Sequence, residues 1–158
     1  MAGSEQIEND APGRLIRAEL PAGLTAARDA RTAVRRALAA WGIADPDRDA
    51  ELLASELAAN AAEHGTGPIS LALHRHAEPD GQAGITCEIT DTSPARPRPP
   101  TAAPQDERGR GLAIVAALAT ASGVRDEPHG KTSWFTLGLH DRIERTATRT
   151  EPEAEAGA

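Results

Sequence analysis

The spacing of hydrophobic residues changes several times along the chain, and each change predicts a new element of secondary structure. Apolar and polar residues alternate, as in half-buried strands, over residues 13–20, 69–76 and 84–90. Apolar residues instead recur every three or four positions, as in amphipathic helices, over residues 25–41, 45–64 and 110–121. A last hairpin is expected over residues 124–127 and 132–139.

Glycine, proline and aspartate lie where these helices are expected to begin and end. Gly42 and Gly65 follow the first two helices directly, as helix-terminating glycines do. Asp45 suits the N-cap of the second helix, and Pro46 suits its first turn. The predicted order is therefore strand, helix, helix, strand, strand, helix, strand, strand.

This order predicts an α+β fold, a two-layer sandwich. A polar turn at residues 78–81 joins two strands, so that pair is expected to be an antiparallel hairpin. Helices grouped on one face of a mixed, mostly antiparallel sheet complete the architecture. Residues 13–140 are expected to form the domain, while the polar segments 1–12 and 141–158 are expected to be disordered.

Composition excludes several classes of protein. The 158 residues carry a net charge of −7 and few aromatic side chains, unlike a nucleic-acid-binding domain. Cys87 is the one cysteine, so neither an intrachain disulfide nor a cysteine metal cluster can form, and a reducing cytoplasm is expected. No apolar run approaches the roughly 20 residues that span a bilayer, so no membrane partner is expected.

The predicted helix 45–64 carries polar residues on its apolar side. At about 100° per residue, Glu56, Asn60 and His64 lie within about 60° of Leu53. Burying such groups without partners costs a few kcal/mol each, which favours a bound polar ligand.

These side chains suggest particular chemistry. The amide oxygen of Asn60 suits Mg²⁺ beside phosphate oxygens, and Glu56 suits a general base. His64 is expected only to cap the helix end. The alternative is a helix rotated by one residue, with Leu52 buried and Glu56 at the boundary.

A carboxylate ends the strand 84–90. Asp91 has the parity of the apolar residues in this strand and is therefore expected to point inward. An inward carboxylate can accept a hydrogen bond from an exocyclic amine such as that of adenine. The alternative is a simple Asx turn before Pro94.

Two glycines precede the third predicted helix. Gly109 and Gly111, flanked by Arg108 and Arg110, are expected to form a loop whose free N–H groups attract phosphate. The alternative is that these glycines only end the Pro-rich loop 94–108. The segment is neither a Walker loop nor a dinucleotide fingerprint, because no Gly-Lys-Ser/Thr follows and no strand precedes it.

In this order and spacing, the features resemble the GHKL ATPase superfamily, which includes the ATP-binding domains of histidine kinases and gyrase. The resemblance covers about residues 13–140 and implies a Bergerat-type ATP-binding fold. The matching segments are Glu56-Leu-Ala-Ala-Asn60-Ala-Ala-Glu-His64 (N box), Asp91-Thr-Ser-Pro94 (G1 box), Gly109-Arg-Gly111-Leu (G2 box) and Gly130-Lys-Thr132 (closing threonine).

The resemblance implies a role for each matching residue. Asn60 would ligate Mg²⁺, Glu56 would be the general base, and Asp91 would bind the adenine amino group. Residues 95–108 would be the ATP lid, and Thr132 would support the adenine through Asp91 and water. The phosphates would be lined by Arg108, Gly109, Arg110, Gly111 and Leu112.

The chain departs from the family pattern at two places. Ser93 stands where the G1 box usually has glycine, which would tighten the approach to adenine. Thr132 shares strand parity with Trp134 rather than with the apolar Phe135, so Ser133 is the alternative contact.

As a small stand-alone domain of this superfamily, the chain resembles the anti-sigma-factor serine/threonine kinases of actinobacterial type. That likeness implies a cytoplasmic kinase that phosphorylates a serine on an anti-anti-sigma (STAS-type) partner and holds a sigma factor, with a homodimer also compatible. One alternative is a non-enzymatic ATP-binding module whose nucleotide state shapes a partner-binding surface. Another is a metal protein using His74 and His76, for which no third ligand has suitable spacing.

Overall fold

The computed structural model describes residues 13–45, 47–64, 67–92 and 107–139. The predicted tails 1–12 and 141–158 lie outside this part of the chain. The observed order of elements is the predicted one, and the α+β class is confirmed. The elements are β1 (Leu15–Leu20), α1 (Ala26–Trp41), α2 (Asp49–His64), β2 (Ile69–Ala77), β3 (Ala83–Asp91), α3 (Glu107–Leu118), β4 (Ala121–Glu127) and β5 (Gly130–Leu139).

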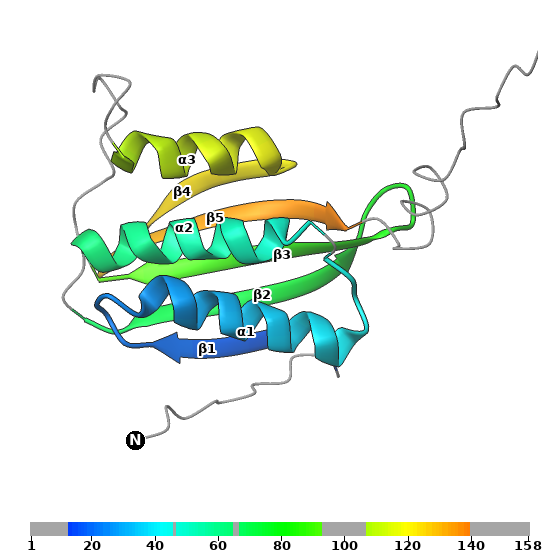
Figure 1. The fold of residues 1–158 in the computed structure, drawn as a ribbon, viewed down its shortest axis with the longest axis horizontal. Coiled ribbons are helices and arrows are strands. Elements are labelled where there is room, and N and C mark those ends of the chain that lie inside the picture. Colours follow the sequence, from blue (N-terminus) through cyan, green and yellow to red (C-terminus); the bar gives the residue numbers. More distant parts are fainter. Residues whose placement is uncertain (1–12, 46, 65–66, 93–106, 140–158) are drawn as a thin grey trace, which may run out of the picture.

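The strands form one sheet in the order β1-β2-β3-β5-β4, and the helices cover one of its faces (Figure 1). All four neighbouring pairs are antiparallel, so the described sheet is not mixed as predicted. The helices explain this. The α1–α2 hairpin returns the chain to the end of the sheet where β1 stops, and Leu20 pairs with Ile69 there. A parallel neighbour would need a connection that crosses to the opposite end.

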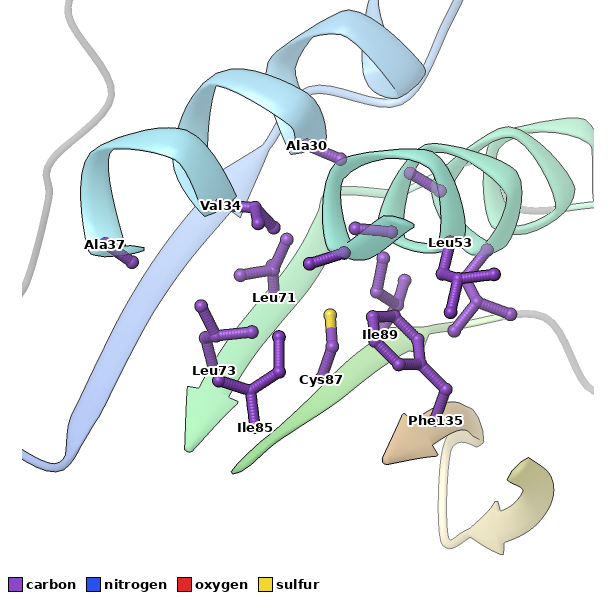
Figure 2. Packing of buried hydrophobic residues seen from close by; sticks show 14 of the residues in the cluster. Ala30, Val34, Ala37, Leu53, Leu71, Leu73, Ile85, Cys87, Ile89 and Phe135 are labelled. Carbon is purple, nitrogen blue, oxygen red and sulfur yellow. The ribbon is translucent and has the colours of Figure 1, made fainter. Parts of the chain in front are cut away.

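The core fills the layer between the helices and the inner face of the sheet. Directly paired residues share a face, and the central strands supply Leu73, Cys87 and Phe135 to the inner one. Figure 2 shows these side chains pointing toward Val34 of α1 and Leu53 of α2. All five side chains are at most 2% exposed. The interior between the helices and the sheet is therefore mainly aliphatic, with one phenylalanine.

Helix α2 begins at Asp49, later than predicted. Pro46, the expected first helical residue, lies outside the described residues. Arg48 has a positive φ of 56°, which places it outside the helix. Asp45 nevertheless caps the helix from a distance, because its Oδ2 accepts hydrogen bonds from the N–H groups of Ala50 (3.1 Å) and Glu51 (3.4 Å).

Helix α3 spans Glu107–Leu118 instead of residues 110–121. Its C-terminal end is set by the sheet: the N–H of Thr120 donates to the carbonyl of Thr136 (2.8 Å), and β4 begins at the next residue. No helix in the described part of the chain is long and apolar enough to cross a membrane.

Candidate functional site

Four segments lie at the same end of the molecule: the C-terminal ends of α2 and β3 and the N-terminal ends of α3 and β5 (Figure 1). The sequence motifs fall on these four segments. Sequence segments that lie far apart are therefore brought to one place by the sheet order.

On α2, Glu56 and Asn60 lie at the border of the buried face rather than at its centre. Both are partly exposed, whereas Leu57 and Ala61 are buried. Leu52 is 38% exposed, so the alternative of a rotated helix with Leu52 buried is wrong, although Glu56 does occupy a boundary position. A border position is what a side chain needs to reach a bound ligand while its helix stays packed.

The Asn60 side chain has a polar atom without a partner. Its Nδ2 atom is buried and makes no hydrogen bond within the described residues. A buried, unsatisfied amide costs roughly 1–3 kcal/mol, and a ligand at this position would remove that cost.

Glu56 contacts α3 at Gly111. A Cβ placed on Gly111 would lie 2.6 Å from Glu56 Oε2, so any larger residue would displace the carboxylate. The predicted glycine loop is therefore wrong in its secondary structure: Gly109 and Gly111 lie within α3. Low helix propensity argues against glycines in a helix, but the absence of a side chain at residue 111 leaves room for the Glu56 carboxylate.

The start of α3 keeps the feature for which the loop was proposed. The first four N–H groups of any α-helix lack partners within the helix, and here they belong to residues 107–110. Arg108 and Arg110 lie in this first turn, and Leu112, partly buried, packs against the core. Ser93 and lid residues 95–106 lie outside the described residues.

Asp91 points inward as predicted and is 2% exposed. Its Oδ2 lies 3.0 Å from Nζ of Lys131, a residue the sequence analysis did not select. Parity along the strand could have identified Lys131. It has the same parity as Ser133 and Phe135, which lie on the core side of β5.

Thr132 is not next to Asp91, which corrects its expected role. It lies on the opposite face of the sheet, where its hydroxyl contacts Thr90 Oγ1 (2.7 Å) and donates to Glu127 Oε1 (2.9 Å). The hydroxyl of Thr132, and then Arg125, hold the pKa of Glu127 below its usual value. Ser133, which is buried on the inner face beside Ile89, is the residue with the parity that adenine contact would need.

The histidine pair lies on the outer face of the sheet, opposite the inward-facing Asp91 and Lys131. His74 and His76 approach Glu88 and Glu78 at 3.8 Å each. Within the described residues, no group of three or more His, Cys, Asp or Glu side chains is arranged to hold a metal ion.

A family model described as histidine kinase-like ATPase domain matches residues 20–137, most of the chain. No protein of curated function matches the chain significantly.

Proposed function

Because the chain belongs to the histidine kinase-like ATPase domain family, we propose that it is a protein serine/threonine kinase acting as an anti-sigma factor. In this proposal it binds Mg–ATP and phosphorylates a serine on an anti-anti-sigma partner of STAS type. The family match supplies an ATP-binding domain of GHKL type over residues 20–137. The narrower role is supported by the resemblance of the Glu56–His64, Asp91 and Gly109–Gly111 segments to anti-sigma-factor kinases.

The residues gathered at this end of the sheet fit Mg–ATP. The amide oxygen of Asn60 is a ligand suited to Mg²⁺. Its Nδ2 atom, unsatisfied within the described residues, could donate to a phosphate oxygen. The N–H groups at the start of α3, which have no partner within the helix, suit phosphate oxygens. Asp91 offers a buried carboxylate that can accept a hydrogen bond from the adenine amine. When bound, ATP would supply the phosphoryl group, and Mg²⁺ would neutralise part of the charge on the phosphates.

Glu56 is suited to the proton transfer. Its carboxylate is partly exposed and lies against Gly111, one helical turn before Asn60. A carboxylate there would take the proton of the attacking serine hydroxyl as the serine oxygen bonds to the γ-phosphorus. The bond from that phosphorus to the β–γ bridging oxygen would break in the same step, and ADP would be the leaving group. The proton ends on Glu56, and the partner gains a charge of about −1.5 to −2, which changes its binding surface.

The observation that carries the proposal is the unsatisfied Asn60 amide one turn from a carboxylate held against Gly111. The test uses Mg–ATP labelled at the γ-phosphate with purified STAS-type proteins as acceptors. Wild type is expected to label a serine, and Glu56→Gln is expected to slow labelling about 100-fold or more. The Kd of Glu56→Gln for ATP, measured by calorimetry, should stay within about threefold of the wild-type value.

Glu63→Gln is the matched control, because Glu63 is an exposed carboxylate on the same helix. It should label the acceptor at the wild-type rate. ATP binding by wild type without transfer to any STAS-type acceptor would contradict the kinase and leave the non-enzymatic ATP-binding module. Transfer at the wild-type rate by Glu56→Gln would remove Glu56 from the mechanism.

A further inference from the structure

A buried lysine is the least expected feature at this end of the sheet. The Lys131 side chain is 2% exposed, and that of Asp91, its partner in the register of β3 and β5, is 1% exposed. Their charged atoms lie 3.0 Å apart. Lysine is almost never fully buried unless it is paired, so this position is specialised.

The ion pair leaves part of the ammonium group unsatisfied. Lys131 Nζ carries three N–H donors and makes no hydrogen bond of acceptable geometry within the described residues. Its contact with Asp91 neutralises charge but satisfies at most one donor. Apolar residues of similar volume often replace a buried ion pair without loss of stability, so stability alone does not account for this lysine.

The backbone fixes where the amine lies. A Cβ on Gly130 would collide with the carbonyl oxygen of Asp91, so the start of β5 lies directly against the end of β3. Lys131 and Asp91 consequently share the inner face of the sheet, the face that the helices cover. The Asp91 carboxylate, an acceptor, and the Lys131 ammonium, a donor, thus lie side by side at the place proposed for adenine.

We propose that Lys131 is a base-recognition residue that works as a pair with Asp91. This inference rests on the proposed function and deepens it. Asp91 accepts a hydrogen bond from the 6-amino group of adenine, and Lys131 donates one to the adjacent ring nitrogen N1. On the edge of adenine that carries the 6-amino group and N1, a donor and an acceptor are adjacent. They match the Asp91 carboxylate and the Lys131 ammonium, respectively. A direct contact from Lys131 takes the place that the family resemblance gave to Thr132 and water.

The test compares ATP with 1-deaza-ATP, in which a C–H replaces N1, by calorimetric titration in Mg²⁺. Wild type is expected to bind 1-deaza-ATP at least about tenfold more weakly than ATP, the effect of one lost hydrogen bond to a charged donor. Lys131→Met is expected to bind the two nucleotides equally. Thr90→Val is the matched control, because Thr90 precedes Asp91 but lies on the opposite face, and it should keep the wild-type ratio.

A second variant covers the risk that Lys131→Met unfolds by leaving Asp91 unpaired. Asp91→Asn/Lys131→Met removes both charges together and is also expected to bind the two nucleotides equally, with folding checked by the ligand-free melting temperature. Equal binding by wild type would overturn the inference. Tighter ATP binding by Lys131→Met than by wild type would also overturn it, because the lysine would then only obstruct the site. Absence of any nucleotide binding by wild type would overturn the proposed function as well.

Discussion

At the scale of single residues, the contact between Gly111 and Glu56 joins the two helices of the candidate site. The position of the Glu56 carboxylate depends on the absence of a side chain on α3. Stability and activity therefore place opposite demands on residue 111, because alanine is the better helix former.

Gly111→Ala should separate these two properties. Alanine in place of a helical glycine stabilises by roughly 0.5–1 kcal/mol, and the flexible end of Glu56 can move away from the new Cβ at little cost. The fold should therefore be at least as stable in urea denaturation. Displacing a catalytic group by about 1 Å can cost on the order of 100-fold in rate, so phosphate transfer should fall about 10- to 100-fold.

The reverse substitution on the same helix is the control. Ala113 is exposed on α3, so Ala113→Gly should cost about 1 kcal/mol of stability and leave the transfer rate unchanged. An undiminished transfer rate in Gly111→Ala would show that the position of Glu56 does not govern catalysis.

Residue parity predicted part of the site and missed part of it. Alternation correctly placed Asp91 on the inner face. Lys131 directly precedes the predicted last strand (132–139) and was not selected, although the observed β5 begins at Gly130 and buries it. Thr132 was carried over from the family pattern against its parity, and the structure places it on the outer face. The close approach of Gly111 to Glu56 could not be predicted, because it depends on how two helices pack.

At the scale of elements, the start of α2 determines how Glu56 and Asn60 are presented. The Asp45 carboxylate holds the first turn through the N–H groups of Ala50 and Glu51. Burial is the main reason that the pKa of Asp45 lies above its usual value of 3.8. A raised pKa means that the folded state prefers the protonated form, so this residue's contribution to stability falls as the pH rises through that pKa.

Substitutions at residue 45 should distinguish the cap from its charge. Asp45→Ala loses the acceptor and should cost about 1 kcal/mol in the free energy of unfolding at pH 7. Asp45→Asn keeps an acceptor oxygen and has no charge to bury, so it should be at least as stable as wild type at pH 7. Its stability relative to wild type should decline toward pH 3, where Asp45 is protonated. Equal losses for both variants at pH 7 would contradict the capping role.

Element type was predictable from hydrophobic period, whereas element boundaries were not. The predicted start of α2 relied on Asp45 and Pro46, but Arg48 adopts a left-handed conformation and delays the helix. The predicted end of α3 ran beyond Leu118, because pairing of Thr120 with Thr136 is a tertiary contact with no local sequence pattern. Long-range pairing also decided that the described sheet is wholly antiparallel.

At the scale of the whole molecule, one hydrophobic core joins all three helices to the sheet. Cys87, the one cysteine of the sequence, lies at 0% exposure in that core. Burial raises the pKa of its thiol, so the folded state holds it protonated and unreactive. Labelling of Cys87 therefore reports opening of the core.

Mg–ATP should slow this labelling. At a nucleotide concentration 100-fold above Kd, binding stabilises the folded state by about 2.7 kcal/mol, which corresponds to a roughly 100-fold slower reaction with a thiol reagent when opening is rapid and reversible. The rate of colour release from an aromatic disulfide reagent measures this. Rapid labelling of the native protein would contradict the buried position of Cys87.

Mg–ATP binding through Asn60 is tested by the melting temperature of the whole chain with and without Mg–ATP, in wild type and in Asn60→Ala. At 100-fold above Kd, the stabilisation of about 2.7 kcal/mol should raise the wild-type melting temperature by roughly 8 °C for a chain of this size. Asn60→Ala should show little shift at the same concentration, and Ala59→Ser, an exposed neighbour, should match wild type. A wild type whose melting temperature does not respond to Mg–ATP would contradict nucleotide binding at this site.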